Sequence, residues 1–289
     1  MSLKSNAMTD KKIKIALVYD FDGTLSPGNM QEYDFIPSVG KNNEEFWAQS
    51  NELAREQDAD PILVYMWKMI RDAQSHDIPV RLEDFRESGR KIGLYKGVVE
   101  WFARVNAYAT SKGIEAEHYI NSSGIKEMIE GTAIAHEFRH IYACSFLYDV
   151  NGVAVWPAVS VNYTNKTQFM FKINKGIEEV FDSKRINQFV PEDERPVPFK
   201  HIIYFGDGTT DIPCMKLVRE KGGHSIAVYN PEEREGKQES MQALIDENRV
   251  SYVRGADYRA GEGLDILVKR IIDKIEADST LDSLSGVNE

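Results

Sequence analysis

The stretch VYDFDGTLSPGN, residues 18–29, places two carboxylates, Asp20 and Asp22, on either side of one phenylalanine. The apolar run IKIALVY, residues 13–19, leads directly into them. This run is rich in β-formers and does not alternate with polar residues, which is typical of a strand buried on both faces of a parallel sheet. Two like charges at the end of a buried strand repel each other. The pair therefore predicts a bound cation, a reaction, or both.

The bulk composition is that of an ordinary globular protein. The chain has 289 residues, of which 42% are apolar and 28% are charged, enough for one large domain or a core domain with a smaller companion. Its formal net charge of −11 argues against nucleic acid and membrane surfaces as partners, because both bind through an excess of lysine and arginine. A small anionic substrate stays compatible with this charge, since one pocket can be cationic within an acidic protein.

Cysteine usage and the N-terminal sequence predict a cytoplasmic protein. Cys144 and Cys214 are too few for a disulfide framework or a four-thiolate zinc site. No apolar run approaches the ~20 residues of a membrane span, and no signal-peptide core precedes the first strand. We expect residues 1–12 to be an N-terminal tail, with a leader before a natural start at Met8. We expect residues 276–289 to be a polar C-terminal tail without regular structure.

Residues 28–92 are predicted to form a small helical cap inserted after the first strand. Apolar side chains recur there at helical spacings, and Pro61 suits the first turn of a helix. Met66, Trp67 and Met69 are predicted to pack inside the cap, with one or two of them lining a substrate cleft as the alternative.

The rest of the chain alternates strands with helices. Strand patterns cover residues 115–124, 201–208 and 224–230, and Val150-Asn151-Gly152 predicts an antiparallel hairpin. This alternation predicts an α/β fold: a doubly wound, mostly parallel sheet with the cap and the hairpin added. The core is expected to consist of residues 13–27 and 93–275.

Polar side chains gather at the predicted carboxyl ends of the strands, where ligands bind in such sheets. They are Asp20, Asp22, Asn121 to Ser123, Asp207 and Asp211. Several carboxylates at neighbouring strand ends need a shared divalent cation, and ligation by oxygen alone indicates Mg²⁺.

A cation at this edge allows a carboxylate to attack a phosphate ester. The cation neutralises the phosphate, so that Asp20 can attack phosphorus without prohibitive repulsion. Asp22 can give a proton to the leaving oxygen and then take one from water. The Ser122 hydroxyl can bind phosphate oxygens, and a lysine at a helix start can complete the charge balance.

These motifs resemble those of the haloacid dehalogenase-like (HAD) hydrolase superfamily, in its phosphoserine-phosphatase-like branch. DFDGTL resembles the first motif, NSSG the second, a lysine before a helix the third, and GDGTTD the fourth. The resemblance covers roughly residues 13–275. It implies a Rossmann-like core, a small phosphorylated metabolite as substrate, and substrate choice by the cap.

The resemblance also implies a role for each motif residue. Asp20 is the expected nucleophile, which becomes an aspartyl phosphate, and Asp22 is the expected general acid and base. Asp20, the backbone carbonyl of Asp22 and Asp207 are expected to hold Mg²⁺, with Asp211 as a further acidic partner. Ser122 is expected to bind phosphate. The acid at Asp22 fits phosphatases and phosphomutases of the family rather than dehalogenases or transport ATPases.

Two of these assignments have alternatives. Lys166 follows Asn165, a good helix N-cap, so its ammonium group is expected near the strand ends. Lys175 is the alternative third-motif lysine, although it falls about a helical turn or more further on. Ser123 is the alternative to Ser122.

Three other functions are compatible with parts of the sequence. A phosphotransferase or phosphomutase would use the same residues, and a catalytically silent binding module would keep the fold. The segment His136-Glu137-Phe138-Arg139-His140 also matches the H-E-x-x-H pattern of zinc proteases. That pattern needs a continuous helix, whereas this segment leads directly into a predicted strand, so the protease is disfavoured.

Overall fold

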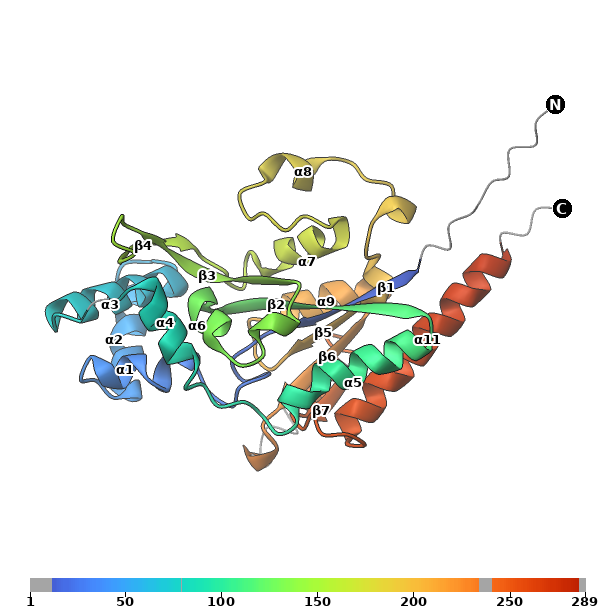
Figure 1. The fold of residues 1–289 in the computed structure, drawn as a ribbon, viewed down its shortest axis with the longest axis horizontal. Coiled ribbons are helices and arrows are strands. Elements are labelled where there is room, and N and C mark those ends of the chain that lie inside the picture. Colours follow the sequence, from blue (N-terminus) through green and yellow to red (C-terminus); the bar gives the residue numbers. More distant parts are fainter. Residues whose placement is uncertain (1–11, 79, 234–240, 286–289) are drawn as a thin grey trace.

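The computed structural model describes residues 12–78, 80–233 and 241–285. Within them the strands form one seven-stranded sheet in the order β4-β3-β2-β1-β5-β6-β7 (Figure 1). All neighbouring pairs are parallel except β3 with β4, which is antiparallel. The strands are β1 (Ile13–Tyr19), β2 (Ile114–Ile125), β3 (His140–Tyr148), β4 (Ala154–Val159), β5 (Ile202–Gly206), β6 (His224–Tyr229) and β7 (Tyr252–Gly255). The predicted doubly wound α/β sheet with an antiparallel hairpin is confirmed.

Helices cover both faces of the sheet. In Figure 1, α5 and α11 lie on one face, and α7 and α9 lie on the other. The helices on the two faces, together with the short helices near them, are α5 (Val98–Ser111), α6 (Lys126–Gly131), α7 (Lys166–Lys175), α8 (Ser183–Asn187), α9 (Ile212–Glu220) and α11 (Gly263–Ser285). The short 3-10 helices here are η2 (Ala135–Glu137), η3 (Glu192–Glu194), η4 (Phe199–His201) and η5 (Pro231–Glu233).

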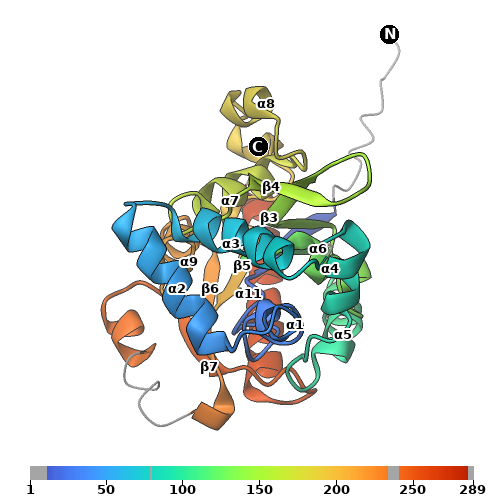
Figure 2. The same cartoon turned by 90° about the vertical axis from the view of Figure 1, so that its left-hand side faces the viewer.

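Among the described residues, four helices between β1 and α5 gather at one end of the molecule, away from the C-terminal end of α11 (Gly263–Ser285) (Figures 1 and 2). They are α1 (Phe35–Ser38), α2 (Asn43–Glu56), α3 (Pro61–Ser75) and α4 (Leu82–Gly89), preceded by the 3-10 helix η1 (Met30–Glu32). Pro61 occupies the first turn of α3, as predicted, and the Asp60 side chain caps that helix by accepting from the N–H groups of Ile62 and Leu63. The predicted helical character of this segment is therefore confirmed.

The sheet carries the buried core. Tyr19 and Trp101 are fully buried, and the Trp101 indole N–H donates to the Tyr19 hydroxyl at 2.9 Å. That hydroxyl lies 3.1 Å from Nδ1 of His118, whose Nε2 lies 2.9 Å from Oδ1 of Asn106. Because the indole can only donate, the tyrosine gives its proton to Nδ1 and His118 carries its own on Nε2. Burial lowers the pKa of His118 to about 3, so it stays neutral and links β1, β2 and α5.

One local expectation differs from the structure. The C-terminal tail expected for residues 276–289 is helical as far as Ser285, because Ile275 and the preceding apolar residues anchor a long α11. The strand predicted at residues 115–124 is observed as β2, and its hydroxyl-rich end after Ile120 stays in the strand with a shifted register. The leader expected before Met8 lies outside the described residues. None of the described helices is long and apolar enough to cross a bilayer.

Candidate active site

The ends of two adjacent parallel strands bring the predicted acidic residues together. Asp20 follows β1 and Asp207 follows β5, and the two strands pair in register from Ala16 with Ile202 onward. The Asp20 N–H donates to the Phe205 carbonyl at 2.9 Å, so the pairing extends to the first acidic residue. Parallel strands finish at the same edge, and this edge is where the carboxylates collect.

Gly23 allows the turn after Asp22 to pass close to Asp207. Its φ is +75°, a left-handed conformation that favours glycine. A Cβ atom at this position would lie 2.1 Å from Oδ2 of Asp207. The glycine in DFDGTL is therefore needed for both backbone conformation and space beside the carboxylate.

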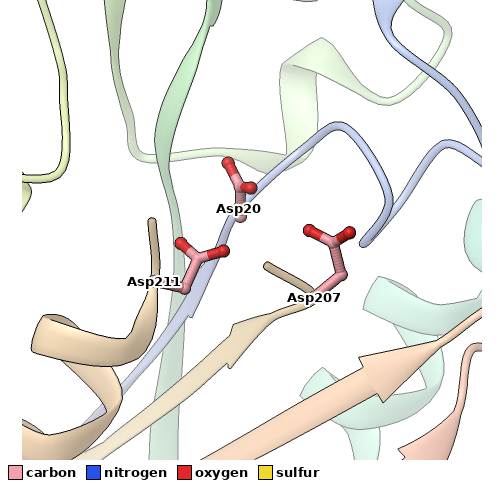
Figure 3. A group of neighbouring side chains, drawn as sticks. All are labelled: Asp20, Asp207 and Asp211. Atoms are coloured by element: carbon pink, nitrogen blue, oxygen red, sulfur yellow. The ribbon is translucent and has the colours of Figure 1, made fainter. Parts of the chain in front are cut away.

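Three aspartates form a compact acidic group (Figure 3). Asp20, Asp207 and Asp211 each offer a carboxylate oxygen, and these oxygens all lie within 4.8 Å of one another. Asp20 and Asp211 are buried, and Asp207 is partly buried. The side chain of Asp22 lies outside this group and accepts from the Met30 N–H at 3.0 Å.

Lys166 lies in the same cluster. It is the first residue of α7 and is fully buried, with its Nζ 2.7 Å from Oδ1 of Asp211 and 3.2 Å from Oδ1 of Asp20. The Tyr204 hydroxyl also donates to Oδ1 of Asp211, at 2.7 Å. Asp211 thus holds the ammonium group beside Asp20. Asn165 does occupy the N-cap position, but its side chain makes no cap hydrogen bond and instead bonds the backbone of Ser160 and Asn162.

Lys175, the alternative lysine, lies at the opposite end of α7. Its Nζ donates to the carbonyls of Ile186 at 2.6 Å and Gln188 at 2.7 Å. These contacts tie down the loop around α8 and leave Lys175 outside the acidic cluster. Of the two lysines, the structure places Lys166 beside Asp20.

Burial and mutual repulsion shift the proton affinities of the aspartates. Burial and the charge of Asp211 raise the pKa of Asp20 to about 6. Burial and the charge of Asp20 raise the pKa of Asp207 to about 8, and they also raise the pKa of Asp22 well above its usual range. Burial acts against the charge of Lys166, but the carboxylates of Asp20 and Asp211 outweigh it and raise the pKa of this lysine.

The donor set fits a magnesium ion. All three clustered side chains offer hard oxygen atoms, and one lysine does not neutralise three carboxylates held this close together. Burial is the first cause of the raised pKa values of Asp20 and Asp207, and repulsion from the neighbouring carboxylates adds to it. A divalent cation at this point would remove the repulsion.

A cavity of about 550 Å³ opens above the cluster. Its volume is in the usual range for small-molecule sites, roughly 300–1,000 Å³. Its lining comes from all three predicted motif segments at the strand ends and from η1, α2 and α3. The lining residues are Asp20, Asp22, Gly23, Pro27, Gly28, Asn29, Gln31, Glu32, Trp47, Ile62, Tyr65, Ser122, Ser123, Gly124, Asp207, Gly208, Thr209 and Thr210.

Both candidate serines line the cavity. Ser122 is buried and accepts from the Gly124 N–H at 3.1 Å, and its hydroxyl lowers the pKa of Asp20 in opposition to burial. Ser123 has a buried Oγ without a hydrogen-bond partner among the described residues. The irregular register of β2 turns successive serines towards the same cavity, which a regular strand would not do.

Two alternatives that the sequence left open are not supported at the site. Met66 and Met69 are fully buried, which confirms their predicted packing, whereas Trp67 lies on the surface beside Trp156, and none of the three lines this cavity. The H-E-x-x-H segment contains only the three-residue helix η2 before β3 begins at His140. It therefore lacks the continuous helix that puts two histidines on one face, and the zinc-protease alternative is wrong.

Sequence reasoning missed several cavity residues. Gln31, Glu32 and Trp47 come from η1 and α2, and Tyr65 comes from α3. Ile62 and Tyr65 are three residues apart on α3, a spacing that indicates one helix face. No local pattern indicates which face meets the motif residues, because that depends on how the helices pack on the sheet.

Comparison with known proteins places the chain in a family. A model of the haloacid dehalogenase-like hydrolase family matches residues 17–216. This span exceeds half of the chain, and the chain therefore belongs to that family, as its motifs predicted. It is an enzyme of this hydrolase family with the fold of its phosphatase members.

Individual relatives are distant. An uncharacterized protein of Borreliella burgdorferi is 29% identical over 294 residues, covering 89% of this chain and 96% of that one. A HAD family hydrolase from Salmonella enterica serovar Typhi has a similar structure, with a TM-score of 0.54, 16% identity, and coverage of 90% of this chain and 72% of that chain. A probable phosphoserine phosphatase from Vibrio cholerae gives a TM-score of 0.56, 13% identity, and coverage of 93% and 68%. At these identities the two structural likenesses show the fold.

Proposed function

We propose that this protein is a magnesium-dependent phosphatase that hydrolyses a small phosphomonoester through an aspartyl phosphate on Asp20. The observation that carries the proposal is the position of Asp20. Its carboxylate lies on the cavity wall, 3.2 Å from the buried Lys166 ammonium and within one acidic group with Asp207 and Asp211. A carboxylate beside an ammonium group, in an acidic group that would hold a divalent cation, can approach a phosphate without prohibitive repulsion.

Each residue has a defined part in the proposed reaction. Asp20 attacks phosphorus, and the bond from phosphorus to the ester oxygen breaks. Asp22 gives its proton to that leaving oxygen, which departs as the alcohol. Asp22 then takes a proton from water as the water oxygen attacks the aspartyl phosphate, which releases phosphate and regenerates Asp20. The raised pKa of Asp22, caused by burial and by Asp20, suits a side chain that starts the reaction protonated.

Asp20, Asp207 and the Asp22 backbone carbonyl would hold Mg²⁺, with Asp211 near them. The positive charge of the ion would stabilise the negative charge on the phosphate oxygens. Lys166 holds the charge of Asp20 and Asp211 in place, and the hydroxyls and N–H groups of Ser122 and Ser123 offer donors for phosphate oxygens.

The surroundings of the site support a cap and a cytoplasmic setting as parts of the same proposal. We assign residues 28–92 as the cap that covers the cavity and excludes water, because η1, α2 and α3 supply one side of its lining. The core is then residues 13–27 and 93–275. Cys144 and Cys214 are buried free thiols, as expected for a protein kept in a reducing compartment.

The test is phosphate release from a panel of phosphomonoesters with and without Mg²⁺. We expect release to require Mg²⁺ and to fall by about 1,000-fold or more in Asp20→Asn, because the amide cannot form the acyl phosphate. Asp193→Asn removes an exposed acid on η3 and is the matched control. Phosphate release by Asp20→Asn at the rate of the parent protein would contradict the proposal. Acceptor-dependent phosphoryl transfer without release would indicate the phosphotransferase alternative.

A further inference from the structure

The part of the cavity lining that comes from outside the motif segments has an unusual chemistry. It is built by Glu32, Gln31, Trp47 and Tyr65, from η1, α2 and α3. Among the described residues that line the cavity there is no lysine, arginine or histidine. We call these four residues the leaving-group wall, because the alcohol part of a bound ester would face them while its phosphate faces Asp20.

Glu32 is held in place with one oxygen free. Its Oε1 accepts from the Asn29 side-chain amide at 2.6 Å and from the Trp47 indole N–H at 2.8 Å. Oε2 accepts no hydrogen bond from the described residues. A carboxylate fixed in this way has lost the freedom to turn away from the cavity, so it acts as a preorganised acceptor for a cation or an N–H donor.

Gln31 adds a second acceptor. Its side chain is only 2% exposed, and its Oε1 is buried without a hydrogen-bond partner in the described part of the chain. A buried polar atom without a partner costs free energy unless a ligand satisfies it. Gln31 lines the same cavity as Glu32, but its Oε1 is itself buried, so a ligand would meet this acceptor after the side chain turns towards the cavity.

Two aromatic rings form a corner beside these acceptors. The rings of Trp47 and Tyr65 lie 5.6 Å apart between centroids and meet at 68°. The Tyr65 hydroxyl donates to the Ser123 carbonyl at 2.6 Å, and the Trp47 indole is tied to Glu32, so both rings are fixed. Aromatic faces next to a carboxylate are a favourable environment for an organic cation.

We propose that the preferred substrate is a phosphate monoester of a short primary amino alcohol, whose ammonium group is bound by Glu32, Gln31, Trp47 and Tyr65. This inference rests on the proposed phosphatase function and names its substrate class. A primary ammonium group offers N–H donors to both Glu32 and Gln31. An ester that also carries a carboxylate is disfavoured, because that carboxylate would face Glu32 with no basic side chain in the described lining.

The test compares matched esters on the parent protein with Mg²⁺. We expect kcat/KM for 2-aminoethyl phosphate to exceed that for propyl phosphate, its neutral match, by about tenfold or more. Phosphocholine should fall between them, because it keeps the cation but has no N–H donor. O-phosphoserine should fall below 2-aminoethyl phosphate, because of its added carboxylate.

The variant Glu32→Gln keeps the size of the side chain and removes its charge. We expect the ratio of kcat/KM for 2-aminoethyl phosphate to that for propyl phosphate to fall by about tenfold. Glu44→Gln, at an exposed acid on α2 that does not line the cavity, should leave this ratio as it is in the parent. An unchanged ratio in Glu32→Gln would overturn the proposal.

A binding measurement separates failure of the proposed ammonium site from failure of the proposed phosphatase function. Calorimetric titration of Asp20→Asn with each ester in the presence of Mg²⁺ should show tighter binding of 2-aminoethyl phosphate than of propyl phosphate. Equal affinities, together with equal hydrolysis rates in the parent, overturn the ammonium site and leave the phosphatase standing. Selective binding without phosphate release from any ester overturns the phosphatase and keeps the ammonium site.

Discussion

Lys166 shows how burial sets one residue apart from the others of its type. Most lysines of this acidic chain lie at the surface, whereas Lys166 is fully buried between Asp20 and Asp211. Burying an ammonium group costs desolvation free energy, which is recovered only when carboxylates lie at contact distance. The structure pairs Lys166 in this way, and the third-motif assignment that the sequence left open between Lys166 and Lys175 now favours Lys166.

The lysine assignment is tested by two parallel substitutions. We expect Lys166→Met to lower kcat/KM for phosphate release by about 100-fold or more, because Asp20 loses its neighbouring positive charge. Lys175→Met removes two hydrogen bonds to loop carbonyls and should keep activity within about twofold of the parent. Lys166→Arg keeps the positive charge and is the conservative control. Circular dichroism of all three variants separates loss of folding from loss of catalytic activity. Greater loss in Lys175→Met than in Lys166→Met would reverse the assignment.

Contacts between elements explain the position of helix α4 in the proposed cap. Helix α4 packs directly on α6, and two glycines make this approach possible. A Cβ atom at Gly89 would lie 1.9 Å from the Met128 carbonyl oxygen, and one at Gly131 would lie 2.0 Å from the carbonyl oxygen of Arg86. The two backbones are thus in contact, and α4 is fixed to the sheet through α6.

The close contact between α4 and α6 predicts how a methyl group added at Gly89 changes the free energy of unfolding. Alanine is the better helix former by about 1 kcal/mol, so an unpacked Gly89→Ala variant would gain stability. We expect instead a decrease in the free energy of unfolding of about 1–3 kcal/mol, because the backbones must separate to admit the methyl group. Glu87→Ala, at an exposed position of the same helix, should change it by less than about 0.5 kcal/mol. Urea denaturation of the two variants distinguishes these outcomes, and a stabilised Gly89→Ala would refute the packing argument.

The hairpin of β3 and β4 also joins the cap helices to the sheet. The Ala154 N–H donates to the Val80 carbonyl at 2.8 Å, and the Leu82 N–H donates to the Gly152 carbonyl at 3.1 Å. These bonds form a short bridge between Arg81 and Val153. The segment that carries α1–α4 is therefore held at both α6 and the hairpin, and the cavity is built between elements with fixed positions.

At the scale of the whole molecule, the acidic cluster joins segments far apart in the chain. Asp20 follows the first strand, Lys166 begins α7, and Asp207 and Asp211 come after β5. The cavity adds residues from η1, α2 and α3. Repulsion among the carboxylates opposes this assembly, and a cation that binds the folded chain alone stabilises it by mass action.

Magnesium should therefore raise the thermal stability of the whole protein. At a hundredfold excess over Kd the expected gain is about 2.7 kcal/mol, or a rise in Tm of about 5 °C. Asp207→Asn should lose this response, because it removes one of the carboxylates that would hold the ion. Asp193→Asn, at an exposed position, should keep it. A scanning-calorimetry experiment in which Mg²⁺ leaves the parent Tm unchanged would contradict the assigned metal site.

The sequence by itself determined the strand-helix alternation, the hairpin and the acidic residues at the strand ends, because these depend on local periodicity and on motifs within a few residues. It also identified the family. The tertiary structure alone decided which lysine meets Asp20, which face of α3 reaches the cavity, and that Glu32, Gln31 and Trp47 share it with Asp207. Those choices depend on packing between segments that are distant in the chain, and no local pattern encodes the distances between them.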